Sequence, residues 1–353
     1  MLNIGLIGCG YWGPNLLRNF SAHPQANVRM VAELDSARLD YIHKKYPQIK
    51  TTKDYFDLFC DDIDAVVIAT DPASHFPLAQ EALLRGKHVL VEKPLAMRAQ
   101  EAQTLLALAE EHHRKLMVGH TFEFNAAVQE LKTQIELGII GKPYYFYTQR
   151  LNFGIVRSDV NALWSLAPHD ISILIYVLDE MPLSVSARGF DFIQPGNEDI
   201  VFMILDFPNG VAAHVHVSWL DPSKVRRMSV VGSDKMIIYD DIADNKIQIF
   251  DKGIKKQNMK ASMGRFDDFG SHQLVKSAGD VYYPKIDFVE PLKVECNHFI
   301  EAILEDKEIL TDGYNGLRVV QVLEAAQRSL KENGKKIRIA AGSPVTRYQL
   351  PVS

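Results

Sequence analysis

A glycine-rich turn close to the start of the chain constrains the fold more than any other feature. An apolar stretch, 2–7, leads directly into Gly8-x-Gly10-x-x-Gly13. Gly8 permits a tight turn, Gly10 lets the backbone approach a pyrophosphate, and Gly13 lets the following helix pack closely on the strand. The helix N-terminus then directs free amide groups at the anion. This order of strand, glycines and helix predicts a dinucleotide-binding unit.

An acidic residue twenty positions after Gly13 supports this prediction. Glu33 ends the second apolar stretch, where a carboxylate can accept both ribose hydroxyls of the adenosine and repel a 2'-phosphate. We therefore expect NAD as the cofactor, with NADP less favoured. Arg38 is the counter-evidence, because a guanidinium at that position could reach a phosphate. Tyr11 and Trp12, inside the glycine turn, complete the cofactor contacts expected from this segment.

Apolar strands alternate with helical patterns through the first third of the chain, which predicts a parallel, doubly wound α/β sheet covered on both faces. The expected strands are 3–7, 28–33, 65–69, 88–91 and 116–119. The expected helices are 15–21, 36–45, 55–59, 75–85 and 99–112. We assign residues 1–122 to this NAD(P)-binding domain.

The segment after the strand 65–69 lies at the carboxyl edge of the predicted sheet, where ligands bind in folds of this kind. Thr70 and Pro72 belong to this loop, and both are expected to contact the cofactor. His75 follows at the start of the next helix. Its ring either contacts the cofactor or only packs against the loop.

The strand 88–91 ends in Glu92-Lys93-Pro94. A charge pair at the end of an apolar strand is costly to bury, so we expect both Glu92 and Lys93 beside the cofactor. Pro94 restricts Lys93 to an extended backbone. From there the ammonium can hydrogen-bond a substrate hydroxyl and stabilise negative charge on its oxygen. The alternative is a structural ion pair that ends the strand.

These segments together resemble the Gfo/Idh/MocA oxidoreductases, the family of glucose-fructose oxidoreductase and inositol dehydrogenase. The resemblance lies in Gly8-x-Gly10-x-x-Gly13, Ala69-Thr70-x-Pro72-x-x-His75, Gly86-Lys87-His88-Val89-x-x-Glu92-Lys93-Pro94, Phe122-x-Phe124-Asn125 and Gly138-x-Ile140-Gly141. It implies a nicotinamide-binding fold followed by an α/β domain with a large open sheet that often makes dimer or tetramer contacts. It also implies oxidation or reduction of a sugar or polyol carbon, with Lys93 in the active site.

The pattern changes after about residue 123. A helix is expected at 126–137, followed by strands with period-two alternation and by helices at 292–304 and 316–332. The expected strands are 144–150, 184–189, 200–206, 211–218, 227–231, 235–239 and 246–250. Alternation joined by turn residues predicts a mostly antiparallel sheet. We assign 123–353 to a substrate-binding and oligomerisation domain, an α+β unit.

The candidate base of the second domain is His169. We expect a helix capped by Ser165, with Pro168 in its first turn and His169 one turn in. A histidine near a helix N-terminus resists protonation, and a neutral imidazole can accept a hydroxyl proton while hydride leaves the same carbon. The alternative is a histidine that only caps or packs. By the family resemblance an acid belongs four residues before this histidine, but Ser165 stands there, so His169 is expected to work without a carboxylate. We do not expect Asp170 to substitute for it, since adjacent helix positions point apart.

The lead-in to this helix, with Arg157 and Asn161, is similar to the subset of the family that acts on nucleotide sugars. Arg157 is a candidate for holding a diphosphate, a task suited to its forked donors; a plain surface arginine is the alternative. Asn125, Asn161 and Ser165 complete the expected substrate contacts, beside Lys93 and His169.

Composition excludes several other classes. A net charge of −5 and the absence of a basic stripe argue against a nucleic-acid partner, and no apolar run is long enough for a membrane span. Three cysteines far apart, with no secretory pattern at the N-terminus, favour a reducing cytoplasm. His214 and His216 share a strand face but lack further ligands, so we expect no metal.

We therefore predict an NAD(P)-dependent dehydrogenase acting on a secondary hydroxyl of a sugar, most specifically C3 of a nucleotide-linked amino sugar. Its partners are the small-molecule substrate and further copies of itself, as a homodimer or homotetramer formed through the C-terminal sheet. The competing predictions are a polyol or inositol dehydrogenase, an NAD-assisted glycosidase, and a non-catalytic ligand sensor on the same fold.

Overall fold

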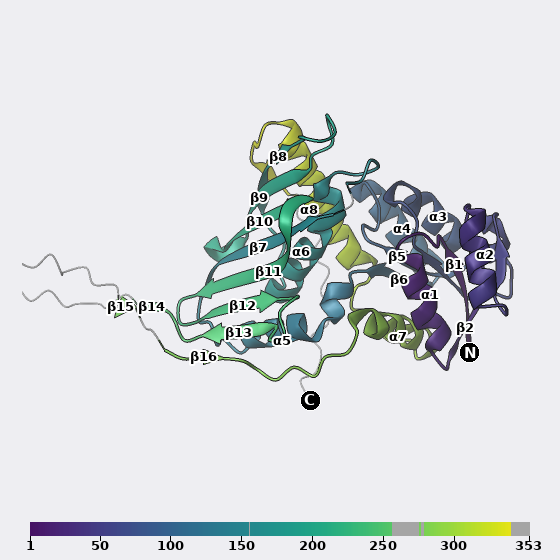
Figure 1. The fold of residues 1–353 in the computed structure, drawn as a ribbon, viewed down its shortest axis with the longest axis horizontal. Helices are drawn as coiled ribbons and strands as arrows, with labels where there is room; N and C mark the ends of the chain where they lie inside the picture. Colours follow the sequence, from purple (N-terminus) through teal and green to yellow (C-terminus); the bar gives the residue numbers. More distant parts are fainter. Residues whose placement is uncertain (155, 256–274, 277–278, 340–353) are drawn as a thin grey trace, which may run out of the picture.

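Two β-sheets organise the chain, as Figure 1 shows. The computed structural model describes residues 1–154, 156–255, 275–276 and 279–339. The glycine-rich turn belongs to a six-stranded sheet, and most of the second half of the chain belongs to a nine-stranded one. Helices cover both faces of the first sheet and one face of the second.

The first sheet is entirely parallel, as predicted. Its strands follow the order β3-β2-β1-β4-β5-β6, the doubly wound order of a dinucleotide-binding fold. The bounds are β1 Leu2–Ile7, β2 Ala26–Ala32, β3 Lys50–Thr52, β4 Ala65–Ile68, β5 His88–Glu92 and β6 Leu116–Gly119. The pattern missed only β3, which is too short to show a period. Since β4 and β6 are buried along their whole length and β5 at every residue after His88, they read as continuous apolar runs.

The helices of this unit connect its strands. They are α1 Gly13–Ala22, α2 Ser36–Lys45, α3 Pro72–Leu84 and α4 Ala99–Glu111. The segment Tyr55–Phe59, expected as a helix, is a 3₁₀ turn, η1, which begins where the Asp54 carboxylate accepts the Phe56 N–H. A second 3₁₀ turn, η2 (Thr121–Phe124), leads out of β6 and into the second half of the chain.

The second sheet follows the order β16-β13-β12-β11-β7-β10-β9-β8-β17. Neighbouring strands are antiparallel except for the parallel pair β7 and β10. The bounds are β7 Pro143–Phe153, β8 Ser184–Phe190, β9 Ile200–Asp206, β10 Ala212–Ser218, β11 Leu220–Gly232, β12 Met236–Asp240, β13 Ile247–Phe250, β16 Val281–Tyr282 and β17 Ile337–Arg338. A short turn η3 (Pro208–Gly210) joins β9 to β10, and β14 (Ile254–Lys255) pairs with β15 (Val275–Lys276) outside this sheet.

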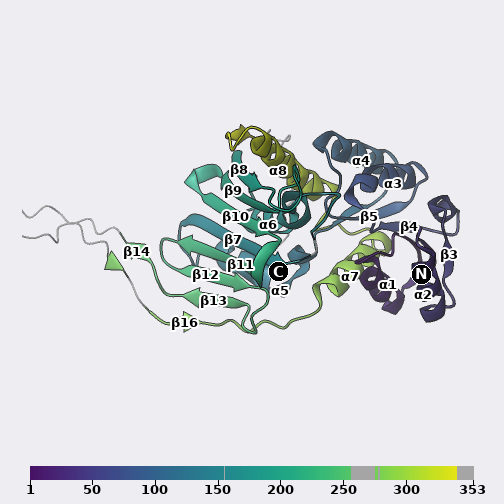
Figure 2. The same ribbon diagram turned by 45° about the horizontal axis from the view of Figure 1, so that its top comes forward.

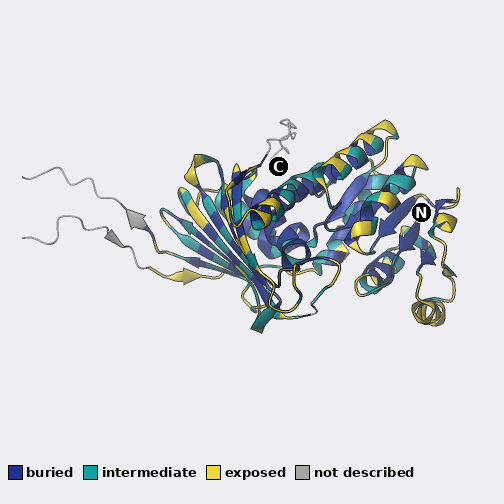
Figure 3. Cartoon of the chain, turned by 90° about the horizontal axis from the view of Figure 1, so that it is seen from above, coloured by how far each residue is buried: buried dark blue, intermediate teal, exposed yellow. Residues whose placement is uncertain are grey.

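Helices cover one face of this sheet and leave the other open (Figures 2 and 3). The covering helices are α5 Ala126–Glu136, α6 Ala162–Leu178 and α8 Gly313–Lys331. In contrast, α7 (Pro291–Leu304) packs on α1 and η2, so the chain returns to the first unit before its last helix. The strands alternate between residues buried under the helices and partly exposed residues on the open face.

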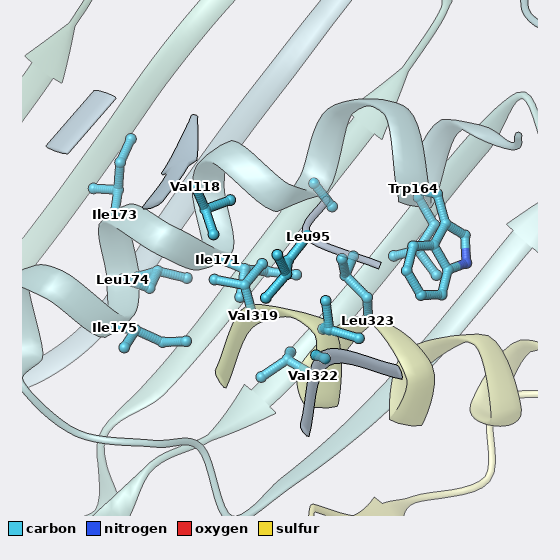
Figure 4. Packing of buried hydrophobic residues seen from close by; sticks show 14 of the residues in the cluster. Leu95, Val118, Trp164, Ile171, Ile173, Leu174, Ile175, Val319, Val322 and Leu323 are labelled. Atoms are coloured by element: carbon cyan, nitrogen blue, oxygen red, sulfur yellow. The ribbon is translucent and has the colours of Figure 1, made fainter. Parts of the chain in front are cut away.

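The two units share one apolar core, seen in Figure 4. Leu95, just after the Glu-Lys-Pro step, and Val118 of β6 pack with Ile171 of α6 and with Val319 and Leu323 of α8. All five side chains are almost completely buried. This packing fixes the carboxyl edge of the first sheet against the middle of α6.

The helix that carries His169 begins earlier than predicted. The N-cap of α6 is Asn161, whose Oδ1 accepts the Trp164 N–H at 3.2 Å, so Ser165 lies within the helix and does not cap it. Pro168 is likewise inside the helix, and His169 lies two turns from the N-terminus. The prediction failed because asparagine caps as well as serine, and α6 is apolar on all sides, which hides its start.

Among the described residues, no helix combines the length and hydropathy needed to cross a bilayer.

Candidate active site

The glycine turn has the geometry that the motif requires. Gly8 has a φ of +89°, a conformation that favours glycine. A Cβ at Gly13 would lie 2.3 Å from the carbonyl oxygen of Gly8, so only glycine allows α1 to approach the strand. At Gly10 the nearest atom to such a Cβ is Nη1 of Arg38, at 3.2 Å. The space beside Gly10 is therefore bounded only by a flexible side chain, which suits the approach of a pyrophosphate.

Glu33 lies at the end of β2 with its carboxylate turned toward this turn. Its Oε2 accepts the Cys9 N–H at 2.7 Å and its Oε1 accepts the Asp35 N–H at 3.0 Å. Arg38 Nη1 is 3.8 Å from Glu33 Oε2. The carboxylate is thus held in place by backbone amides, and the guanidinium stands between it and Gly10. Both residues are where an adenosine ribose would be recognised.

Two aromatic side chains of the turn are exposed. Tyr11 is 83 % exposed and Trp12 is 36 % exposed, although large aromatic residues are usually buried. Exposed rings beside the glycine turn can cover a bound dinucleotide. Both predicted contacts therefore remain accessible to a cofactor.

The loop after β4 is held by His75. Its ring is completely buried, with Nδ1 2.7 Å from the Pro94 carbonyl oxygen and Nε2 3.1 Å from the Thr70 carbonyl oxygen. His75 therefore ties the Thr70 loop to the Glu-Lys-Pro loop, and the geometry favours packing over direct cofactor contact. Thr70 shares its hydroxyl with Ser74 at 2.7 Å, while Pro72 is buried in the first turn of α3.

The Glu92-Lys93 step lies at the carboxyl end of β5. Glu92 is buried, and burial raises the pKa of its carboxyl to about 7 against the opposing charge of Lys93. Lys93 Nζ donates to the Ser165 carbonyl oxygen at 3.1 Å, so the lysine spans from the first sheet to α6. Burial lowers the pKa of Lys93 to about 8; Glu92 opposes this shift, and Arg157 and Arg150 add to it.

His169 faces the same space from α6. Its ring packs edge-on against Phe122, with centroids 5.0 Å apart, and Nδ1 is buried without a hydrogen-bond partner. Burial, followed by the charge of Lys93, lowers its pKa well below the ordinary value. The expected cause, the helix dipole, is a minor one here, because the dipole effect fades beyond the first turn.

Several residues around His169 were not predicted as part of the site. Arg150 of β7 and Asp170 of α6 form a buried ion pair with Nε and Oδ2 2.7 Å apart, which leaves Asp170 committed elsewhere. Arg226 of β11 pairs with Asp241 at 3.3 Å. Both guanidinium groups lie over the Phe122 ring, at 4.5 and 5.9 Å from its centroid. The alternation of β7 and β11 places both arginines on the covered face, but only pairing between distant strands brings them together.

Two buried titratable groups behind Lys93 also escaped prediction. His120, at the end of β6, has both ring nitrogens buried without partners, and burial lowers its pKa to about 3. Glu295 of α7 is fully buried, and burial together with the charge of Glu92 raises its pKa well above the ordinary value. Nothing in their sequence neighbourhoods separates them from ordinary surface residues.

Of the predicted substrate contacts, two asparagines use their amides inside the protein, and Ser165 contacts Lys93. Asn125 caps α5 and its amide donates to Asp241 Oδ1 at 3.1 Å, and Asn161 caps α6 and donates to Glu198 and Gln327. These two amides are occupied within the protein. Ser165 contributes its carbonyl oxygen to Lys93 as described above.

Arg157 lies at the junction of the two units. Its guanidinium pairs with Asp159 and lies 3.7 Å from Asp71, in the loop after β4. The side chain is 32 % exposed. The Arg157 side chain therefore extends from the second unit to the carboxyl edge of the first sheet. It remains accessible to an anionic ligand.

The residues of the glycine turn, Glu33 and the β4 and β5 loops fit a dinucleotide bound along the carboxyl edge of the sheet. The open space at Gly10 and the fixed Glu33 carboxylate are the observations that support this fit. Among the described residues, no group of three His, Cys, Asp or Glu side chains could hold a metal ion.

Comparison with known families agrees with this arrangement. Residues 2–120 match the profile of the oxidoreductase family with an NAD-binding Rossmann fold, GFO_IDH_MocA, and residues 128–238 match the GFO/IDH/MocA C-terminal domain. The chain belongs to the Gfo/Idh/MocA family. It is an NAD-binding oxidoreductase of this family, whose curated relatives include dehydrogenases of sugars and polyols.

Individual relatives are distant but match along most of their length. The UDP-N-acetylglucosamine 3-dehydrogenase of Acidithiobacillus ferrooxidans is 25% identical, over 90% of this chain and 94% of that protein. The scyllo-inositol 2-dehydrogenase (NAD(+)) of Bacillus subtilis is 24% identical, over 96% and 95%. The crystal structure of the WlbA dehydrogenase from Bordetella pertussis, in complex with NADH and UDP-GlcNAcA, has the same fold, with a TM-score of 0.79 at 20% identity over 97% and 98%.

Proposed function

We propose that this member of the family is a dehydrogenase that transfers hydride between a secondary alcohol carbon of a sugar and NAD. The single observation that carries the proposal is the convergence of Lys93 and His169, from opposite units, at the carboxyl edge of the NAD-binding sheet. An ammonium and an imidazole in one space supply the hydrogen bonds and the proton transfer that oxidation of a hydroxyl needs.

NAD supplies the hydride acceptor when it is bound. Gly8, Gly10 and Gly13 would receive its pyrophosphate, and the Glu33 carboxylate would accept the adenosine ribose hydroxyls. Glu33 stands 3.8 Å from Arg38, so the guanidinium beside Gly10 is already opposed by a negative charge. This arrangement supports NAD over NADP.

The substrate we propose is a nucleotide-linked amino sugar, oxidised at C3. Two observations support this class. The UDP-N-acetylglucosamine 3-dehydrogenase is among the relatives that match nearly the whole chain. The partly exposed Arg157 lies at the sheet edge, where a diphosphate can replace Asp71 as the partner of its guanidinium. We place this reaction in the reducing cytoplasm, a location that suits three free cysteines.

The test is a panel of nucleotide sugars and polyols incubated with NAD, followed by reduced-nicotinamide fluorescence and by mass spectrometry of a 3-keto product. Net NADH formation supports a dehydrogenase, whereas an NAD-assisted glycosidase returns the cofactor to its starting state. The variants Lys93→Met and His169→Asn should lose nearly all turnover and keep their affinity for NAD. Full activity in both variants would refute the assignment.

We also propose that the protein assembles as a homodimer or homotetramer through the open face of its nine-stranded sheet. Tyr145, Phe202 and Ile204 on this face are between 37 and 52 % exposed, and His214 stacks on Tyr147 with centroids 5.2 Å apart. Exposed apolar side chains on neighbouring strands of one sheet face are typical of an interface.

A further inference from the structure

Lys93 and His169 are not equally able to accept a proton. Resting on the proposed dehydrogenase function, we propose that Lys93 is the base that takes the substrate's hydroxyl proton, and that His169 stays neutral and donates a hydrogen bond from Nε2 to the same oxygen. This reverses the roles that the sequence suggested. The argument starts from the hydrogen-bond partners of the two side chains.

His169 lacks the acceptor that a base of this kind needs. To accept a proton at Nε2, a neutral imidazole must already carry its hydrogen on Nδ1. Nδ1 of His169 is buried with no partner, so that N–H would be left without an acceptor, which costs about 1–3 kcal/mol. With the hydrogen on Nε2 instead, only a lone pair is buried at Nδ1, and Nε2 is ready to donate.

Neither of the two positions from which a carboxylate was considered compensates for a positive imidazole. Ser165 stands at the position of the acid that the family resemblance leads one to expect, and the Asp170 carboxylate is bound to Arg150. Lys93 of the β5 loop, Arg150 of β7 and Arg226 of β11 face His169, and the charge of each lowers its pKa. His120 also faces it and is neutral near pH 7, since burial lowers the pKa of His120 to about 3. These three positive charges thus oppose the formation of an imidazolium at His169.

Lys93 is in the opposite situation. Its Nζ is held by an uncharged acceptor, the Ser165 carbonyl oxygen, at 3.1 Å, so the amine keeps its position after it loses a proton. The charged groups around it are Arg150, Arg157 and Glu92. Glu92 is the one carboxyl among them, and burial raises its own pKa to about 7, which limits the negative charge it offers near neutral pH.

The resulting pKa of about 8 for Lys93 leaves a usable fraction of neutral amine. At pH 7 about a tenth of the molecules carry it, and a base whose pKa lies near the working pH is the efficient one. In the oxidation, the O–H bond breaks and its proton goes to the Nζ lone pair. The C–H bond gives its hydride to NAD, the named oxidant, and the freed O–H electron pair forms the C=O bond.

The first test needs no substrate. The full-length, cofactor-free protein is labelled with ¹³C and ¹⁵N in histidine and with ¹³C in lysine, and NMR spectra are recorded from pH 5.5 to 10. Signals are assigned by their loss in His169→Gln and Lys93→Arg. We expect His169 to remain neutral, with its hydrogen on Nε2, and Lys93 to titrate near pH 8. Titration of His169 between pH 6 and 7, or a hydrogen on Nδ1, would overturn the proposal.

The second test uses kcat/KM for oxidation of UDP-N-acetylglucosamine with NAD as a function of pH. A lysine base predicts a tenfold rise per pH unit below about pH 8, then a plateau; a histidine base of strongly lowered pKa predicts no rise in this range. His169→Gln, whose amide still donates a hydrogen bond, should be slower and keep the rise, whereas Lys93→Met should lose it. If the rise in kcat/KM with pH is lost in His169→Gln and is kept in Lys93→Met, the lysine is not the base and the proposal is refuted.

A matched pair of variants separates this role from a structural one. Glu92→Gln removes the negative charge that raises the pKa of Lys93. The rise in kcat/KM should therefore occur at lower pH in this variant. Glu295→Gln should leave it in place, because Glu295 already holds its proton. If both variants shift the pH of this rise by the same amount, the electrostatic argument is contradicted. A protein that fails to oxidise the sugar but shows the expected NMR titrations contradicts the proposed substrate and leaves the assignment of the base standing.

Discussion

The buried ion pair between Arg150 and Asp170 gives the sharpest stability prediction. Their side chains are only 7 and 4 % exposed, and two hydrogen bonds join them, at 2.7 and 3.4 Å. Asp170→Asn keeps the shape of the side chain and one oxygen acceptor, but it leaves the Arg150 charge uncompensated. Removing one partner of a buried pair costs about 3–5 kcal/mol, and we expect the lower end of this range because the asparagine oxygen can still accept from Arg150.

The chain contains a matched control for this substitution. Arg157 and Asp159 form the same kind of pair, but their side chains are 32 and 36 % exposed. An exposed pair contributes about 0–1 kcal/mol, so Asp159→Asn should change the free energy of unfolding little. Urea denaturation followed by circular dichroism measures both values. Equal losses in the two variants would show that burial does not set the cost, and would refute the reasoning.

The same variant has a kinetic consequence. With Asp170 neutral, Arg150 presents an uncompensated positive charge to Lys93, whose pKa it already lowers. The pKa of Lys93 should fall further, and the pH at which oxidation reaches its plateau should decrease. The double variant Arg150→Met/Asp170→Leu removes both charges, and it should recover most of the lost stability, since apolar replacements of buried pairs are often neutral.

Further predictions concern the cofactor site and the open sheet face. Gly10→Ala meets only the end of the Arg38 side chain, so the free energy of unfolding should change by about 0.5 kcal/mol or less, while calorimetry shows at least a tenfold loss of NAD affinity. Gly13→Ala places Cβ 2.3 Å from a backbone oxygen, and urea denaturation should show a loss of about 1–3 kcal/mol. Glu33→Ala leaves Arg38 paired with Asp35 and removes the carboxylate that repels a 2'-phosphate, so the ratio of NADP to NAD affinity, measured by calorimetry, should rise about tenfold, the equivalent of about 1.4 kcal/mol. Ile204→Glu should yield monomers in sedimentation velocity; an unchanged oligomer would place the interface elsewhere.

Local chemistry explains why the first unit could be predicted so closely. The glycine turn, the position of Glu33 and the alternation of strands and helices each depend on residues near one another in the sequence. A φ of +89° at Gly8 and the close approach at Gly13 are demands of the backbone itself. The parallel sheet followed from these signals because continuous apolar runs leave few other arrangements.

The start of α6 shows where such reasoning stopped. Two good capping residues, Asn161 and Ser165, stand four positions apart in an apolar segment, and sequence alone offered no means to choose between them. The choice is made by contacts with Glu198 and Gln327, which hold the Asn161 amide and come from other parts of the chain. Asn125 and Asn161 were likewise named as substrate contacts, but the tertiary structure occupies their amides.

The sequence by itself predicted a dinucleotide site at the glycine turn and pointed to Lys93 and His169 as the candidate reactive groups. Only the tertiary structure decided how they divide the chemistry. The proton affinity of a side chain depends on its burial and on charges within a few ångströms, and Arg150, Arg226 and Glu92 reach this space from separate strands. No local pattern records such an encounter, because it arises only when the two sheets pack on α6.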